Sequence, residues 1–173
     1  YGDSLSSQPC LVGCVATAIE QLLSYYRYPD ALLDSIPGWK TDNYSLETVP
    51  AGSVIDWDDV ADLSLWCGMI VQMKYGPTAS AAGLWRAEEP LKQVFGYKTV
   101  KVLDRSLYSF DAWHRILQNE LLSGRPVAYV GYNNTLSGHA FNIDGVNENG
   151  LYHCNWGEGE HHNGYFSLEH LCQ

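Results

Sequence analysis

The sequence predicts an α+β domain with a helical N-terminal part and an antiparallel sheet at its C-terminal end. Apolar residues recur with a period of 3.6 before Gly124, and with a period of 2 after it. The length of 173 residues suits a single domain. We therefore expect one α+β domain over residues 1–173, with a helical part of about 1–124 and a sheet part of about 125–173.

Four segments of the helical part are predicted as helices. These are residues 14–26, 58–73, 84–94 and 110–122. The first has a continuous apolar stripe, with Gly13 before it and Pro29 after it as boundary residues. Gly124 ends the last one, while Pro90 weakens the pattern in the third.

Four further segments, after Gly124, are predicted as strands because apolar and polar residues alternate and turn residues separate them. They are residues 127–132, 139–146, 151–156 and 164–168. Two stretches without periodicity, residues 30–54 and 76–83, are predicted as loops. A loop as long as 30–54 is often functional in a compact domain.

The composition argues against several classes of protein and partner. Lys and Arg number 10 and Asp and Glu 20, so the net charge of −10 disfavours nucleic acid or an anionic membrane surface as the main partner. No apolar run reaches the roughly 18–20 residues that span a bilayer. The chain begins at Tyr1 with no targeting segment, so we expect a processed product.

The five cysteines leave two interpretations open. They are Cys10, Cys14, Cys67, Cys154 and Cys172. An odd number means that at least one thiol is unpaired within the chain. Either all are free thiols of a reducing compartment, or one reactive thiol accompanies up to two disulfides.

Cys14 is the first candidate for catalysis because it stands at a predicted helix start. Unpaired N–H groups and the helix dipole favour a thiolate there, and the Cys14 N–H can donate to a developing oxyanion. A small apolar residue that simply begins the helix is the alternative. His139, which follows Gly138 where a loop enters a strand, favours catalysis, since a thiolate nucleophile needs an imidazole partner.

The strand register decides which residue can orient His139, and two registers are open. If residues 145–149 form the hairpin loop, His139 lies opposite Asn155, whose amide can accept from one ring nitrogen. If residues 147–150 form it, His139 lies opposite Glu158 and Asn155 points to the other face.

Four collinear motifs resemble the streptopain-type cysteine peptidases, a bacterial branch of the papain-like enzymes. The motifs are residues 13–18 (GCVATA) with Gln21 and Tyr28-Pro29, residues 75–83 beginning Tyr75-Gly76-Pro77, residues 138–141 (GHAF) with 143–145 (IDG), and residues 152–157 (YHCNWG) with 164–166 (GYF). The resemblance runs from about Gln8 to Leu168 and implies a papain-like fold.

The resemblance assigns catalytic roles to residues of this chain. Cys14 would be the nucleophile and His139 the general acid and base. It favours the register that places Asn155 opposite His139, with Trp156 covering that contact from water. The Cys14 N–H would supply one oxyanion donor, and Gln8, at the spacing seen in papain, is the candidate for the second.

The resemblance also points to a substrate region and to departures from the family. Gly138 would line the specificity pocket, and Ala79 and Ala81, which stand in place of serines, would lie near the substrate. Glu158 replaces a second tryptophan. The chain stops before the family's further strands, so it is either a reduced member or one piece of a cleaved precursor whose second chain completes it.

The implied function is that of a secreted, cell-surface or periplasmic bacterial cysteine endopeptidase acting on proteins or peptides without a cofactor or metal. The family is made as a zymogen, so a removed prosegment or a dedicated inhibitor is an expected partner. With Cys14 kept free, the other four cysteines remain for up to two disulfides.

Three alternative functions compete with this one. They are a Cys/His amidase or acyltransferase acting on a non-protein amide, a catalytically inactive binding relative, and a metal-binding module. The last would use residues near the C-terminus, namely His153, Cys154, His161, His162, His170 and Cys172.

Overall fold

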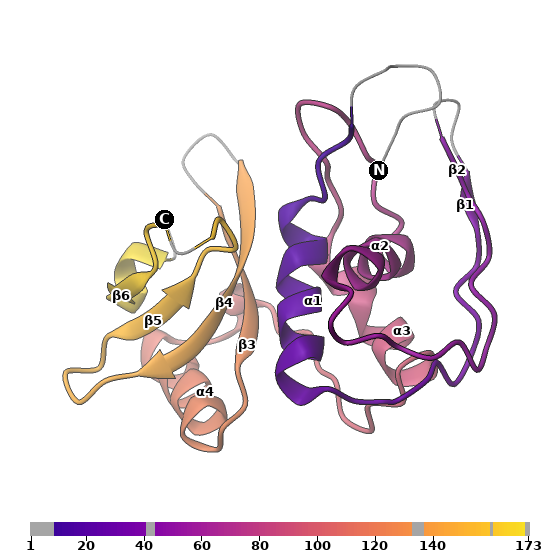
Figure 1. The fold of residues 1–173 in the computed structure, drawn as a ribbon. Coiled ribbons are helices and arrows are strands. Elements are labelled where there is room, and N and C mark those ends of the chain that lie inside the picture. Colours follow the sequence, from indigo (N-terminus) through magenta and orange to yellow (C-terminus); the bar gives the residue numbers. More distant parts are fainter. Residues whose placement is uncertain (1–8, 41–43, 133–136, 160, 172–173) are drawn as a thin grey trace. The chain divides into compact units, whose positions relative to one another are not determined.

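The chain forms two compact units, shown in a computed structural model that describes residues 9–40, 44–132, 137–159 and 161–171 (Figure 1). The N-terminal unit is Tyr1–Val102 and the C-terminal unit is Leu103–Gln173. Helices and an antiparallel sheet confirm the predicted α+β class. The helix α4 (Phe110–Leu122) packs on the sheet and so belongs to the C-terminal unit.

The N-terminal unit contains the predicted helices in modified form. It comprises α1 (Cys14–Tyr26), β1 (Trp39–Lys40), β2 (Ser45–Leu46), α2 (Val60–Ile70), the 3-10 helix η1 (Leu84–Ala87) and α3 (Glu88–Gln93). The bounds of α1 are those predicted, and α2 is shorter. The predicted helix 84–94 is divided into η1 and α3. Pro90 lies in the first turn of α3, where a missing N–H costs no helical hydrogen bond.

The helices α1 and α2 pack against each other in this unit (Figure 1). Ile19 and Leu23 of α1 and Leu63 of α2 are each 1–2% exposed. Burying side chains of this size contributes roughly 1.5–3 kcal/mol each. The helix α1 ends at Arg27, whose left-handed backbone lets its N–H donate to the Leu23 carbonyl at 2.8 Å. This packing gives the Cys14 end of α1 a fixed support.

Short antiparallel pairings join residues 30–40 to residues 44–54, where the sequence predicts a loop. Strands β1 and β2 pair antiparallel, and single bridges join Ala31 to Val54 and Ile36 to Val49. The side chain of Ile36 is fully buried, so it holds this paired segment on the core of the unit. Interruptions by proline and glycine leave too short an alternating pattern for these strands to be predicted from the sequence.

The C-terminal unit is a four-stranded antiparallel sheet with α4 packed on it (Figure 1). The strands, in sheet order, are β3 (Val127–Tyr132), β4 (Gly138–Val146), β5 (Tyr152–Asn155) and β6 (Gly164–Phe166), and two 3-10 helices, η2 (Arg105–Leu107) and η3 (Leu168–Leu171), flank them in the chain. All four predicted strands are present, with β3 at its predicted bounds. The core buries Trp113 and Leu117 of α4 against Phe141 and Tyr152.

The register between β4 and β5 differs from the one that the family resemblance favours. Asn142 pairs with Asn155 and Val146 with Tyr152, and a bulge lies between Ile143 and Gly145. The expectation that Asn155 lies directly opposite His139 is therefore wrong. The physical reason is the position of the turn: Val146 pairs with Tyr152, so the loop is residues 147–151, two residues later than the favoured register requires. The bulge shifts the pairs beyond it by only one position. The Asn142–Asn155 pair is the one that the second register, with residues 147–150 as the loop, predicts.

Within the ranges that the structure describes, no helix is both long enough and apolar enough to cross a bilayer.

Candidate active site

Cys14, the predicted nucleophile, is the first residue of α1. Gly13 before it has φ 90° and ψ 135°, a conformation that favours glycine. A Cβ at Gly13 would lie 3.0 Å from Cε of Met73 and 3.1 Å from Cβ of Ser80. The first turn of α1 contains no acidic residue. Cys14 therefore stands at the N-terminal end of the helix dipole, with no acidic side chain in the same turn.

The loop predicted to face the substrate follows Met73 in the same unit. We define the substrate-side loop as residues 75–81. Lys74 and Ala81 close its base, since each main-chain N–H donates to the other's carbonyl, at 3.0 and 3.1 Å. The side chains of Ala79 and Ala81 are exposed. They are therefore available for contact with a peptide.

His139, the predicted acid and base, lies near the start of β4 in the C-terminal unit. Its Nε2 is 2.9 Å from the main-chain carbonyl oxygen of Trp156. A carbonyl oxygen can only accept, so Nε2 carries the proton in this contact and Nδ1 is the basic nitrogen. The imidazole stacks on Phe141, with ring centres 6.3 Å apart and an interplanar angle of 12°. These contacts fix both the tautomer and the plane of the ring.

The segment that follows β5 holds the Trp156 carbonyl in place. The side-chain oxygen of Asn155 accepts from the Gly157 N–H at 3.0 Å, and that of Asn163 accepts from the Trp156 N–H at 3.0 Å. The Trp156 ring lies 4.4 Å from the Phe141 ring, centre to centre. The contact given to Asn155 in the sequence analysis is thus made by the Trp156 main chain. Asn163 is a supporting residue that sequence reasoning missed.

The other predicted site residues are placed as follows. Gly138 is the first residue of β4 and pairs with Tyr132 of β3. A Cβ at Gly138 would come 2.8 Å from the Tyr132 ring, so the absence of a side chain lets that ring lie against the main chain. Gln8, the candidate second oxyanion donor, lies outside the described residues.

The described cysteines are free thiols, namely Cys10, Cys14, Cys67 and Cys154. Two disulfides are thus not formed, and Cys172 lies outside the described residues. Burial raises the pKa of the Cys67 thiol well above its ordinary value, and that of Cys154 to about 12. Because a thiolate is the reactive form, neither buried cysteine is suited to be a nucleophile.

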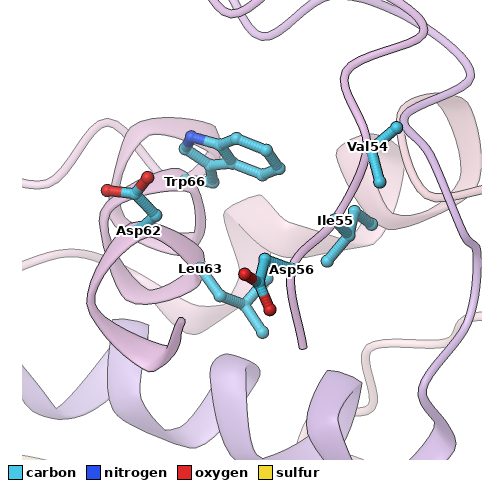
Figure 2. A pocket seen from close by; sticks show the side chains of 6 residues that line it. All are labelled: Val54, Ile55, Asp56, Asp62, Leu63 and Trp66. Atoms are coloured by element: carbon cyan, nitrogen blue, oxygen red, sulfur yellow. The ribbon is translucent and has the colours of Figure 1, made fainter. Parts of the chain in front are cut away.

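One further pocket of the N-terminal unit contains none of the predicted site residues (Figure 2). Its lining is Val54, Ile55, Asp56, Asp62, Leu63 and Trp66. Leu63 and Trp66 project from α2 and the first three residues from the segment that precedes it (Figure 2). In the described ranges, no three His, Cys, Asp or Glu side chains are grouped so that they could hold a metal ion.

The sequence of this chain matches a known protein family over most of its length. A sequence model of the Peptidase C10 family matches residues 1–166. The chain belongs to the Peptidase C10 family. Streptopain of Streptococcus pyogenes is 31% identical over an alignment 193 positions long, which covers 98% of this chain and 48% of streptopain. The thiol protease/hemagglutinin PrtT of Porphyromonas gingivalis is 31% identical over 185 residues, or 96% of this chain and 21% of that protein.

Solved structures of family relatives agree with the fold. Active wild-type interpain A, a cysteine protease of Prevotella intermedia, aligns with a TM-score of 0.84 and 29% identity, covering 92% of this chain and 76% of that one. A prointerpain A fragment of Prevotella intermedia aligns with a TM-score of 0.83 and 30% identity. The alignment covers 94% of this chain and 58% of the fragment. The streptopain-type relationship and the papain-like fold are therefore confirmed. The chain spans about half the length of the streptopain it matches, 48%.

Proposed function

We propose that this C10 family member is a cysteine endopeptidase that hydrolyses peptide bonds of protein substrates. The observation that carries the proposal is the contact between His139 Nε2 and the Trp156 carbonyl. It leaves Nδ1 as the nitrogen able to exchange a proton with a thiol. Cys14, at a helix start with no acidic residue in its first turn, is the thiol suited to that exchange.

The proposed reaction has two steps. The Cys14 thiolate attacks the peptide carbonyl carbon, and His139 donates its Nδ1 proton to the leaving amine, which leaves a thioester on Cys14. His139 then takes a proton from water at Nδ1, and the water oxygen attacks the thioester, which releases the carboxylic acid and restores the Cys14 thiolate beside the protonated imidazole. The Cys14 N–H donates to the oxyanion in both steps, and Gln8 is proposed as the second donor.

Other groups have supporting roles in this proposal. The Trp156 carbonyl orients His139, and Asn155 and Asn163 hold that carbonyl by their hydrogen bonds. Ala79 and Ala81 of the substrate-side loop and Gly138 of β4 contact the peptide.

We further propose that the enzyme acts outside the bacterial cytoplasm, secreted or at the cell surface or in the periplasm. Its partners are a protein or peptide substrate and either a removed prosegment or a dedicated inhibitor. The prosegment is supported by a relative whose structure is that of prointerpain A. A second chain of the same precursor is proposed as a further partner.

The test compares the wild-type protein with Cys14→Ala and His139→Ala on a denatured protein substrate. The wild type is expected to cleave it, and each variant to lose about a thousandfold in kcat or more. Cys10→Ala, which removes another free thiol of the same unit, is the control and is expected to retain activity. Equal cleavage by Cys14→Ala and wild type would show that Cys14 is not the nucleophile. Turnover of a non-protein amide and of no peptide, by a protein whose Cys14 still reacts with an alkylating reagent, would favour the amidase alternative.

A further inference from the structure

The Ser80 hydroxyl joins the segment that leads into Cys14 to the substrate-side loop. Its Oγ donates to the Leu11 carbonyl at 2.6 Å and accepts from the Gly76 N–H at 3.1 Å. The Leu11 N–H donates in turn to the Gly76 carbonyl at 3.1 Å. Both main-chain groups of Leu11 are therefore tied to this loop, three residues before Cys14.

The same side chain also packs beside Gly13. A Cβ built on Gly13 would lie 3.1 Å from Cβ of Ser80, and the φ of Gly13 is +90°. Ser80 thus contacts the segment just before Cys14 at two residues. It donates a hydrogen bond to Leu11, and it packs closely against Gly13. A shift of Ser80 would move the main chain directly before the first residue of α1.

The loop to which Leu11 is tied has a firm base. Besides the pairing of Lys74 with Ala81, the Met73 carbonyl accepts from the Tyr44 hydroxyl at 2.7 Å and from the indole N–H of Trp39 at 3.1 Å. Met73 and Tyr44 are buried, at 0% and 8% exposure. These contacts with buried residues therefore hold the loop that carries Ser80 in a fixed position on the core of the N-terminal unit.

We propose that Ser80 is a positioning residue that sets Cys14 relative to the substrate-side loop. This inference rests on the proposed peptidase function. A hydroxyl suits the role because it donates one hydrogen bond and accepts another at the same atom, which alanine cannot do. The side chains of Ala79 and Ala81, on either side of Ser80, are exposed. A single hydroxyl thus couples the nucleophile to the residues proposed to contact the peptide.

The kinetic test measures kcat and KM for Ser80→Ala, Ser80→Thr and a control on one peptide substrate. Ser80→Ala is expected to lower kcat about tenfold with a smaller change in KM, because two hydrogen bonds that place the nucleophile are lost. Ser80→Thr keeps the hydroxyl and is expected to recover most of that loss. The control is Ser53→Ala, which removes a hydroxyl that donates to the Pro50 carbonyl at 2.8 Å in an exposed turn of the same unit.

A second measurement does not depend on peptide hydrolysis. The rate at which iodoacetamide alkylates Cys14 in the folded protein, followed by mass spectrometry, is expected to change about threefold or more in Ser80→Ala and to stay unchanged in Ser53→Ala. A wild type that hydrolyses no peptide, together with this altered rate, would refute the peptidase function and leave the positioning role supported.

Two results would overturn the positioning role. One is a folded Ser80→Ala protein with wild-type kcat and a wild-type alkylation rate. The other is a folded Ser80→Thr protein as impaired as Ser80→Ala, since the hydroxyl would then not be the group that matters. If Ser80→Ala does not fold, the same two rates measured on Ser80→Gly, which also lacks the hydroxyl, decide the question in the same way.

Discussion

The imidazole Nε2 of His139 lies 2.9 Å from the main-chain carbonyl oxygen of Trp156. The group that orients the imidazole is thus part of the backbone, and no side-chain substitution removes it directly. It depends on the turn after β5, which Asn155 and Asn163 hold from two sides through the N–H groups of Gly157 and Trp156.

The first prediction concerns these two asparagines. Asn155→Ala and Asn163→Ala are each expected to lower kcat/KM about three- to tenfold, because each loses one hydrogen bond that fixes the Trp156 carbonyl. Asn155→Asp keeps an acceptor oxygen and is expected to stay nearer to wild type. The losses are measured against His139→Ala on one peptide. A loss in Asn155→Ala as large as in His139→Ala, with Asn163→Ala unchanged, would mean that Asn155 itself acts on the imidazole.

The second prediction concerns the close packing at Gly13. Gly13→Ala is expected to lower the free energy of unfolding by about 1–2 kcal/mol from the positive φ, and by about 1–3 kcal/mol more from overpacking against Met73 and Ser80. Gly52→Ala is the matched control, since Gly52 has φ +80° and nothing within 4 Å of an added Cβ. Urea unfolding measures both. Equal losses would show that the contacts at Gly13 are easily relieved.

Much of the fold was predictable because its strongest elements have strong local patterns. The helix α1 has a full apolar stripe with Gly13 at its start, and α4 is ended by Ser123 and Gly124. The strand β3 is a short run rich in Val and Tyr that follows the turn residues Gly124 and Pro126. The pairing within residues 30–54 could not be predicted, because its bridges are single and lie between proline and glycine residues.

The candidate site was predictable in its side chains but not in its main chain. Cys14 and His139 stand out because each follows a glycine at the start of an element. The Trp156 carbonyl leaves no mark on the sequence, since every residue has one. The register of Asn155 depends on where the turn between β4 and β5 lies, and the turn residues of 145–150 allow more than one position for it. The position of this turn therefore changed the predicted partner of the imidazole.

The third prediction concerns the selectivity of thiol modification. Cys67 and Cys154 are 0% exposed, and burial raises the pKa of each thiol, so iodoacetamide is expected to leave both unmodified in the native protein. Cys10 and Cys14 are half-buried, and Cys14 is expected to react first. Peptide mapping by mass spectrometry before and after urea unfolding checks this. Modification of Cys154 in the native state would contradict its buried position in the sheet core.

The fourth prediction is a pH dependence of stability that arises from Glu20 on α1. This side chain is only 6% exposed, and Ser24 Oγ donates to its carboxyl oxygen at 2.7 Å. Burial raises the pKa of Glu20 above its ordinary value of 4.5, and the hydrogen bond from Ser24 opposes this in part. The charge of Glu20 also contributes to the raised pKa of the Cys67 thiol on α2. The ionised carboxylate is thus unfavourable between these helices.

The sign follows from which state binds the Glu20 proton more tightly. The folded state does, so the carboxyl ionises first in the unfolded chain as the pH rises above about 4.5. The contribution of Glu20 to stability is therefore most favourable below that pH. It decreases as the pH rises to the raised pKa of the folded state, and then stays constant.

Glu20→Gln removes this titration and keeps an oxygen that can accept from Ser24. The variant is expected to gain free energy of unfolding relative to wild type as the pH increases from 4 to 7, measured by urea unfolding at each pH. Glu47→Gln, at an exposed position of the same unit, is the control and is expected to show no such trend. A difference between Glu20→Gln and wild type that is constant over this range would mean that Glu20 is ionised in the folded state at no cost, against its buried position.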